Sequence, residues 1–219
     1  MILIIDHQDS FTRNLEHLLS DFDKVIVKDR KKVSHKDIND ACLIVLSPGP
    51  GKPNDYPETK DLFHYAIGKK PVLGVCLGFQ LILQEEGGEI IRQDQVLHGV
   101  ETEIEISPGT LTYKQIKGPL RVARYHSLQV SSSSLSSISK TIRITARDPI
   151  RNVPMSFEDS DRMLFGLQYH PESFLTNSGK QIIQNIHHGR SSLSDHSFRG
   201  RQSEGEFGIF ANILRQQSA

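Results

Sequence analysis

Cys76 has the residue type and the setting of a catalytic nucleophile. It lies between Gly74 and Gly78, directly after an apolar run at residues 71–73. A buried strand that passes through a glycine-flanked turn into a helix lifts one side chain to the carboxyl edge of a sheet, as in the nucleophile elbow of α/β hydrolases. The N-terminus of the following helix favours the thiolate form of such a cysteine. The pattern therefore predicts an enzyme that transfers acyl groups through a cysteine.

A nucleophilic cysteine needs a base, and the base needs an orienting group. Of the ten histidines, His170 has a suitable context, because it closes a predicted strand at residues 163–168 and precedes Pro171. This position lies at the sheet edge where the elbow also emerges. Glu172 follows two residues later and can hold the imidazole in the required tautomer. These residues predict a triad of Cys76, His170 and Glu172.

The oxyanion formed during acyl transfer needs two hydrogen-bond donors. The first is expected from the backbone N–H of Leu77, the residue after the nucleophile. The second is expected from the loop Ser47-Pro48-Gly49-Pro50-Gly51, which follows an apolar run at residues 43–46. Gly51 can bring its N–H close to a substrate because no Cβ intervenes.

Each of these residues also has an interpretation without catalysis. Cys76 could be a small core residue, His170 could cap a strand, and Glu172 could be a surface charge. The glycine loop could be a simple turn. Their order along the chain and their common place at strand ends favour the triad. Cys42 is assigned to the core. No metal site is predicted, because the following histidines lack the spacing of metal ligands: His7, His17, His35, His64, His98 and His126.

The surrounding pattern predicts an α/β fold that positions these residues. Apolar runs at residues 2–5, 25–27, 43–46 and 71–73 alternate with helix patterns at residues 11–22 and 62–66, which favours a parallel sheet covered on both faces. Ser10 is placed to cap the first helix. Strand patterns in the second half predict mostly antiparallel strands added to this core, at residues 100–106, 121–124, 127–130, 142–146, 153–157 and 163–168. A last helix pattern runs through Ile182, Ile183 and Ile186.

Composition bounds the partners and the compartment. Lys plus Arg and Asp plus Glu both number 26, so the net charge is zero and gives no argument for nucleic acid or an anionic membrane as the main partner. No apolar run is long enough to span a bilayer, and residues 1–6 resemble a first strand more than a signal peptide. A reactive thiol among only two cysteines must stay reduced, which indicates the cytoplasm.

The length of 219 residues suits one α/β domain. We expect this domain to cover residues 1–188 and a polar, flexible C-terminal tail to cover residues 189–219. The serine-rich segment 131–139 is expected to be a solvated loop.

With these motifs in hand, the chain resembles the class I (triad-type) glutamine amidotransferases. More narrowly, it is similar to component II of anthranilate synthase and of aminodeoxychorismate synthase. Five blocks over residues 1–188 carry the resemblance: Asp9-Ser10-Phe11-Thr12 with Asn14-Leu15, Ser47 to Gly51, Gly74 to Gln80, Arg124-Tyr125-His126-Ser127-Leu128, and His170-Pro171-Glu172-Ser173. The resemblance implies a flavodoxin-like, three-layer fold with a mostly parallel central sheet and added antiparallel strands.

The resemblance also implies roles for individual residues. Cys76 would be the nucleophile, His170 the general base and acid, and Glu172 the orienting group. Glutamine would be held by residues of three blocks, namely Gly49, Pro50, Gly51, Leu77, Gln80, Ser127 and Leu128. No cofactor would be needed in this chain. Chorismate and Mg²⁺ would belong to a partner, component I, which would receive the ammonia and form a hetero-oligomer with this chain.

Four positions depart from the family pattern. Phe79 stands where the family usually has His, which could alter packing at the glutamine pocket or at the face toward a partner. His7-Gln8 and Arg13 replace the more usual Asn-Tyr and Tyr, which could affect the choice of partner.

Several alternatives stay open from the sequence. Anthranilate and aminodeoxychorismate synthesis, or both, are equally compatible with the local chemistry. The chain could instead serve a synthase that makes GMP, CTP or carbamoyl phosphate. It could also be a hydrolase acting alone on γ-glutamyl peptides, or a non-catalytic regulatory subunit that keeps the fold.

Overall fold

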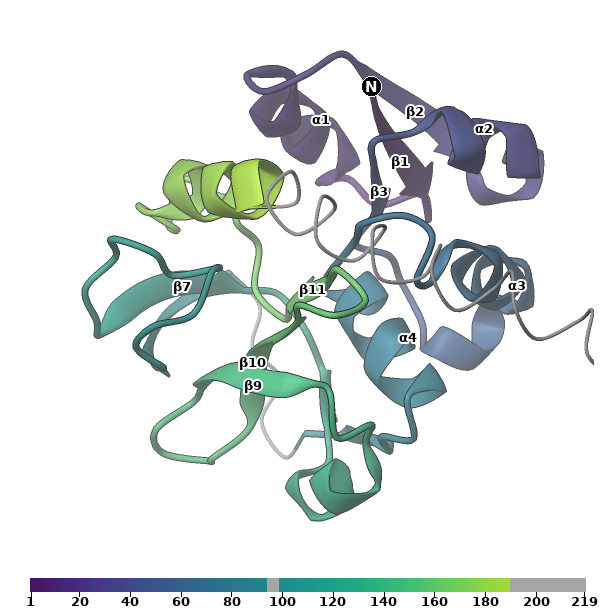
Figure 1. Ribbon diagram of the computed structural model, residues 1–219. Helices are drawn as coiled ribbons and strands as arrows, with labels where there is room; N and C mark the ends of the chain where they lie inside the picture. The colour runs from purple at the N-terminus through teal and green to yellow at the C-terminus, as the bar shows by residue number, and fades with distance from the viewer. Residues whose placement is uncertain (94–98, 190–219) are drawn as a thin grey trace, which may run out of the picture.

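A nine-stranded sheet forms the middle layer of the computed structural model, which describes residues 1–93 and 99–189 of the chain (Figure 1). Its strands follow the order β2-β1-β3-β4-β11-β10-β9-β6-β7, and β5 pairs with β8 in a separate small sheet. The strands are β1 (Ile2–Asp6), β2 (Val25–Asp29), β3 (Leu43–Leu46), β4 (Val72–Val75), β5 (Ile90–Arg92), β6 (Val100–Ile106), β7 (Leu120–Arg124), β8 (Leu128–Val130), β9 (Arg143–Arg147), β10 (Pro154–Asp159) and β11 (Leu164–Leu167).

Helices connect and cover these strands. The α-helices with complete bounds are α1 (Thr12–Ser20), α2 (His35–Asp40), α3 (Pro57–Ala66) and α4 (Leu77–Glu85). The 3-10 helices are η1 (Arg30–Lys32), η2 (Pro53–Asp55) and η3 (Ser132–Ser137). Residues 179–189 are also helical, and Figure 1 shows this segment in yellow-green next to α1. No helix within the described part of the chain is long and apolar enough to cross a membrane.

The first five strands in the sheet order are parallel, as predicted. β1 pairs in parallel with β2 and β3, and β4 pairs in parallel with β3 and β11. The carboxyl ends of β3, β4 and β11 therefore lie side by side at one edge of the sheet. The predicted glycine loop, Cys76 and His170 follow these three ends in the chain, so the topology gathers segments that are far apart in sequence.

The two faces of the sheet carry separate hydrophobic cores, which gives the fold its three layers. Alternate residues of β1 illustrate the division, because Ile2 and Ile4 belong to one core while Leu3 and Ile5 belong to the other. The first core is covered by α1 and the helix at residues 179–189, and the second by α2, α3 and α4. A strand buried on both faces must be apolar throughout, and β1 is completely buried from Ile2 to Ile5.

The second half extends the sheet with antiparallel strands, also as predicted. β10 pairs antiparallel with β11 and β9, and β6 pairs antiparallel with β9 and β7. In β6 the glutamates at 101, 103 and 105 are exposed, whereas Ile104 is buried, as expected for a strand with one wet face. β8 differs from the prediction of a simple addition, because it pairs with the short strand β5 outside the main sheet.

Two further expectations are corrected by the structure. Helix α1 begins at Thr12 with Phe11 as its N-cap residue and no capping side chain, so Ser10 does not cap it. Cys42 packs against the first core but is only partly buried, and its Sγ lies 3.0 Å from Met1 O and 3.2 Å from Asp23 Oδ2, either of which can accept its single S–H. The exact residue at which a helix begins and the degree of burial of a cysteine depend on the folded backbone, which residue type alone does not determine.

The serine-rich segment is ordered by packing and is not merely a solvated loop. Residues Ser132–Ser137 form η3, and the adjacent Ile138 is buried in the second core. The backbone N–H of Ser131 donates to Glu89 O at 2.8 Å, which ties the start of the segment to the chain before β5. The proposed tail lies outside the described residues from 190 onward, and so does His98.

Candidate active site

Cys76 occupies a strained turn between β4 and α4. Its backbone has φ +52° and ψ −98°, and its N–H donates to Leu167 O at 2.8 Å. Such a φ is rare for a residue other than glycine and tends to persist at functional sites. Glycine is required nearby, because a Cβ on Gly78 would lie 2.3 Å from Leu46 O. The sequence therefore forms the predicted elbow, with Cys76 7% exposed at the carboxyl end of β4.

His170 and Glu172 form a buried pair at the neighbouring strand end. His170 Nδ1 and Glu172 Oε1 are 2.7 Å apart, and the two side chains are 2% and 0% exposed. The backbone holds this segment in place, because His170 N–H donates to Ala123 O at 3.1 Å and Thr176 Oγ1 donates to His170 O at 2.7 Å. Because Nδ1 contacts the carboxylate, Nε2 is the ring nitrogen left available to exchange a proton.

The electrostatic setting favours the imidazolium form of His170. Burial alone lowers the pKa of His170, but the Glu172 carboxylate and the interaction with Cys76 together raise it well above its usual value. Nε2 is buried and has no fixed hydrogen-bond partner within the described residues. The arrangement can therefore hold a proton on the imidazole next to the Cys76 sulfur and release it to a leaving group.

A cavity of about 140 Å³ opens next to the thiol. The structure brings together Cys76 and all seven residues expected to hold glutamine, and adds Tyr125 and His126. The lining residues are Gly49, Pro50, Gly51, Cys76, Leu77, Gln80, Tyr125, His126, Ser127 and Leu128. His170 and Glu172 lie outside this lining.

The glycine loop after β3 packs tightly against the elbow. A Cβ on Gly49 would lie 2.4 Å from Leu77 Cδ2 and 2.6 Å from His7 Cβ. Gly51 has φ +74°, a conformation that other residues rarely adopt. Tyr56 Oη donates to Pro50 O at 2.6 Å, which fixes the loop from the side of α3. The loop is thus held within reach of Leu77 by contacts that a larger residue at position 49 would disrupt.

The structure adds one residue that sequence reasoning missed. Gln168 is fully buried, and its Nε2 lies 3.9 Å from Cys76 Sγ while its Oε1 accepts from Gln80 Nε2 at 3.1 Å. The only sequence signal was its place at the end of β11, two residues before His170. Because buried polar side chains are rare without a partner, a glutamine at the end of a buried strand indicates a polar contact at that sheet edge.

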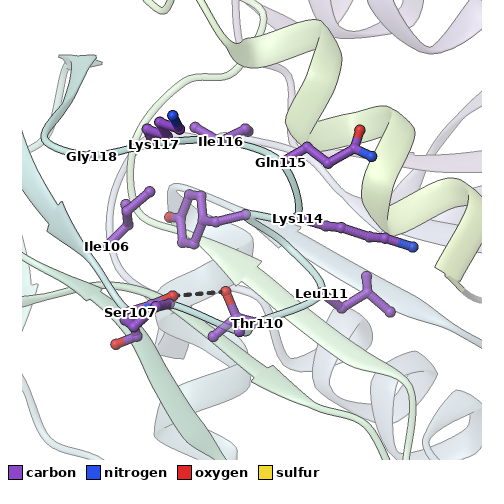
Figure 2. A pocket seen from close by; sticks show the side chains of 12 residues that line it. Ile106, Ser107, Thr110, Leu111, Lys114, Gln115, Ile116, Lys117 and Gly118 are labelled. Atoms are coloured by element: carbon purple, nitrogen blue, oxygen red, sulfur yellow. Dashed lines mark hydrogen bonds between the residues drawn. The ribbon is translucent and has the colours of Figure 1, made fainter.

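A second cavity is larger but shares no lining residue with the one beside Cys76. It has a volume of about 750 Å³ and lies within the loop between β6 and β7, from Ile106 to Gly118 (Figure 2). Figure 2 shows Thr110 Oγ1 donating to Ser107 O, at 3.2 Å, across one side of it. None of its lining residues belongs to the triad or to the predicted glutamine contacts, so its size does not identify the active site.

The departures from the family pattern have different surroundings. Phe79 is completely buried in the second core and packs against Phe157, with ring centroids 5.5 Å apart. It lies neither in the lining of the cavity nor on a face open to a partner. His7 is buried behind the glycine loop, where Nδ1 is 3.0 Å from Ser47 O and Nε2 is 3.1 Å from Thr59 Oγ1. Gln8 and Arg13 are exposed.

No cluster of three or more His, Cys, Asp or Glu side chains in residues 1–93 and 99–189 is arranged to hold a metal ion. At the site, His170 and Glu172 pair with each other, and the His126 imidazole contacts Arg124 and Leu128 O.

Comparisons with known proteins agree with this geometry. A family model for glutamine amidotransferase class-I matches residues 3–188. The anthranilate synthase component 2 of Cyanophora paradoxa is 38% identical over 189 residues, covering 85% of this chain and 97% of that protein. The aminodeoxychorismate synthase component 2 of Escherichia coli K12 is 37% identical over 192 residues, covering 86% of this chain and 100% of that protein.

Two longer or more distant relatives extend the comparison. This chain spans only 31% of the bifunctional protein TrpGD of Thermotoga maritima, to which it is 34% identical over 190 residues, or 84% of this chain. A solved structure assigned as a GMP synthase subunit from Thermoplasma acidophilum superposes with a TM-score of 0.76 at 17% identity, covering 93% of this chain and 97% of that chain. That likeness concerns the fold alone. The family match over most of the chain, on a fold with the elbow at Cys76, shows that this chain belongs to the class-I glutamine amidotransferases.

Proposed function

We propose that this chain hydrolyses glutamine through Cys76, His170 and Glu172 and delivers the ammonia to a partner synthase that converts chorismate. One observation carries the proposal: the strained Cys76 elbow interacts with the buried His170–Glu172 pair and opens on a small cavity lined by the glycine loop. The family shown by the comparisons supplies the substrate class.

The reaction begins at the sulfur. The Cys76 thiolate attacks the carboxamide carbon of glutamine and forms a tetrahedral oxyanion. The backbone N–H groups of Leu77 and Gly51 are the two donors for this oxyanion, because both residues line the cavity beside the thiol. Preorganised donors of this kind are each worth roughly 10²- to 10³-fold in rate.

His170 then moves two protons in turn. Its Nε2 donates a proton to the departing nitrogen as the C–N bond breaks, which leaves a γ-glutamyl thioester and ammonia. The neutral imidazole next accepts a proton from water as the water oxygen attacks the thioester carbon. The C–S bond breaks, glutamate leaves, and the thiolate is restored. Glu172 holds Nδ1 at 2.7 Å throughout and stabilises the imidazolium.

The partner is inferred from the relatives, several of which are named as component 2 of anthranilate or aminodeoxychorismate synthase. The block that distinguishes this branch lies at the active site, because the Phe11 ring is 4.9 Å from the His170 ring and 4.6 Å from the Tyr125 ring. Phe174, two residues after Glu172, is 86% exposed. An apolar side chain so exposed beside the triad is suited to contact with component I, the chorismate-binding subunit.

The remaining parts of the proposal follow from this chemistry. The chain itself uses no cofactor, since thiol, imidazole and backbone N–H groups suffice for each step, and Mg²⁺ acts on component I. The thiol of Cys76 must stay reduced to react, which supports a cytoplasmic location for the proposed complex. The product is anthranilate, aminodeoxychorismate or both, depending on the component I that binds.

The test is glutamate release from glutamine by the purified chain, alone and with each candidate component I. We expect a low basal rate that rises sharply with one or both partners. Cys76→Ala should abolish glutamine-dependent product and leave ammonia-dependent product intact, whereas the matched variant Cys42→Ala should keep both. Equal loss of both activities in Cys76→Ala would overturn the proposed division of labour. A rate unaffected by either partner would move the chain to another synthase.

A further inference from the structure

Gln168 lies between the Cys76 sulfur and Gln80, one of the residues that line the proposed glutamine cavity. Its side chain is fully buried at the end of β11, directly beside the end of β4 that carries Cys76. Gln168 Nε2 lies 3.9 Å from Cys76 Sγ, and Gln168 Oε1 lies 3.1 Å from Gln80 Nε2. The carboxamide therefore bridges the nucleophile and the substrate pocket, and its orientation decides which of its ends faces the sulfur.

A backbone carbonyl fixes that orientation. Leu128 O accepts hydrogen bonds from Gln80 Nε2 at 3.1 Å and from His126 Nδ1 at 2.7 Å. A carbonyl oxygen can only accept, so Gln80 must present its NH₂ group to this side. The same NH₂ group donates to Gln168, which must then turn its oxygen toward Gln80. The NH₂ group of Gln168 is left facing Cys76.

A buried ion pair stabilises the far end of this hydrogen-bonded chain. Arg124 Nη1 donates to Asp148 Oδ2 at 2.6 Å, and Arg124 Nε donates to His126 Nε2 at 3.0 Å. Because Nε2 accepts, the His126 proton must sit on Nδ1, where it reaches Leu128 O. Burial and the neighbouring Arg124 charge lower the pKa of His126 to about 3, so this tautomer is kept at neutral pH. The direction of each hydrogen bond, from Arg124 through His126, Leu128 O and Gln80 to Gln168, is therefore fixed by the one before it.

We infer that Gln168 belongs to the active site and presents an N–H group to the Cys76 sulfur. This inference rests on the proposed function. A donor held against the thiolate stabilises its negative charge before attack and when the thioester breaks. The distance of 3.9 Å is long even for a bond to sulfur. Contacts of this type tighten when substrate binds. At the same time Gln168 Oε1 accepts a hydrogen bond from Gln80 and so helps to position that residue in the cavity. The same side chain therefore links activation of the thiol to glutamine binding.

Two variants separate these contributions. Gln168→Glu is nearly isosteric, keeps an oxygen that accepts from Gln80, and turns a carboxylate oxygen toward the sulfur in place of the donor. Gln168→Met has a similar length and removes both contacts without adding charge. If the N–H donor stabilises the thiolate, Cys76 should be alkylated more slowly in Gln168→Glu than in Gln168→Met. If Gln168 only supports Gln80, the glutamate variant should behave like the wild type.

The experiment measures the rate at which iodoacetamide alkylates Cys76 in the full chain at neutral pH, read by mass spectrometry of the Cys76 peptide. We expect the rate to fall about tenfold or more in Gln168→Glu and less in Gln168→Met, since one charge-assisted hydrogen bond is at stake. Cys42, half-buried on a different part of the fold, is the internal control, because its alkylation should be the same in all three proteins. Faster Cys42 alkylation in one variant would mark a loss of its fold, and the comparison with the wild type then rests on the variant whose Cys42 alkylation is unchanged.

The outcomes distinguish this inference from the proposed function. Wild-type Cys76 should also react with a glutamine-mimicking electrophile, and a failure there would overturn the glutaminase itself. A reactive wild type together with unchanged Cys76 alkylation in both variants would overturn only the role of Gln168. A KM for glutamine raised mainly in Gln168→Met, which loses the contact with Gln80, together with an alkylation rate lowered mainly in Gln168→Glu, would support both halves of the bridge.

Discussion

His170 and Glu172 are joined by a 2.7 Å contact between Nδ1 and Oε1, and neither side chain is appreciably exposed to solvent. The second carboxylate oxygen, Oε2, has no hydrogen-bond partner among the described residues. The negative charge of Glu172 is therefore neither screened by water nor shared with another donor in that part of the chain. It acts mainly on the imidazole and raises the pKa of His170 against the effect of burial.

Glu172→Gln should separate orientation from charge. The amide oxygen can still accept from Nδ1, but the pKa of His170 should fall because the carboxylate charge is gone. We expect kcat for glutamine to drop roughly 10²- to 10⁴-fold, the usual range for general acid–base catalysis. The KM should change little, since Glu172 does not line the cavity. Glutamate release measured across neutral and alkaline pH checks this, and ammonia-dependent product from the complex should be unaffected. A kcat within about threefold of the wild type would contradict the role of the charge.

Gly51→Ala should damage activity through the loop that is proposed to supply an oxyanion donor. Gly51 has φ +74°, and a Cβ there would lie 2.5 Å from Asp55 Oδ2. Gly109→Ala is the matched control, because Gly109 has φ +72° with nothing within 4 Å of a Cβ. Both variants should lose about 1 kcal/mol of unfolding free energy through backbone strain. Only Gly51→Ala should lose glutaminase activity, by about tenfold or more. Equal activity in the two variants would exclude a role for the position of the loop.

The sequence contained enough information to predict that Cys76 and the His170–Glu172 pair meet at one edge of the sheet, because each of these segments carries a local signal. The glycines flanking Cys76 mark a tight strand-to-helix turn, and Pro171 ends the strand before His170. Parallel strands bring their carboxyl ends to one edge, so recognising β3, β4 and β11 was sufficient to bring the loop, the thiol and the imidazole together. None of these steps required knowledge of side-chain packing.

The hydrogen-bond partners inside the site could not be predicted in the same way. Gln168 reaches Cys76 and Gln80 because β11 pairs with β4 in the register that sets Leu167 opposite Val75. A shift by one residue would turn the Gln168 side chain to the other face of the sheet. Likewise, the burial of Ile138 depends on how the serine-rich segment packs, and composition does not specify that.

Phe79→His would introduce the residue more usual in the family at a position that is apolar here. Phe79 is fully buried and packs on Phe157, so an imidazole there would lack the polar partner that a buried ring nitrogen requires. We expect a loss of about 1–3 kcal/mol of unfolding free energy and a Tm lower by about 5 °C. Phe79→Leu should cost less. Because Phe79 does not line the cavity, kcat/KM should stay within about twofold in the folded protein. Unchanged stability with altered KM would show instead that position 79 acts on the glutamine pocket.

His7→Asn should change how the stability of the fold depends on pH. His7 is buried, and burial lowers its pKa from 6.5 to about 4 despite a compensating contact with Ser47 O. The unfolded state therefore binds more protons than the folded state between these two values, so stability is complete above about pH 6.5 and is lost as the pH falls toward about 4. At about pH 5 the protonation difference is worth about 2 kcal/mol.

The variant lacks this titrating group, so its unfolding free energy should fall less between about pH 7.5 and pH 5, by about 2 kcal/mol relative to the wild type. Denaturant unfolding of both proteins at the two pH values measures the difference. The substitution leaves one contact with Ser47 in place, because Ser47 Oγ accepts from the backbone N–H of position 7 at 2.9 Å, and this bond does not depend on the side chain. Two curves that run parallel over this pH range would show that His7 titrates alike in the folded and unfolded states. Since His7 also packs against the glycine loop at Gly49, a steeper acid loss of glutaminase activity in the wild type than in the variant would show that this loop is the part of the fold that opens first.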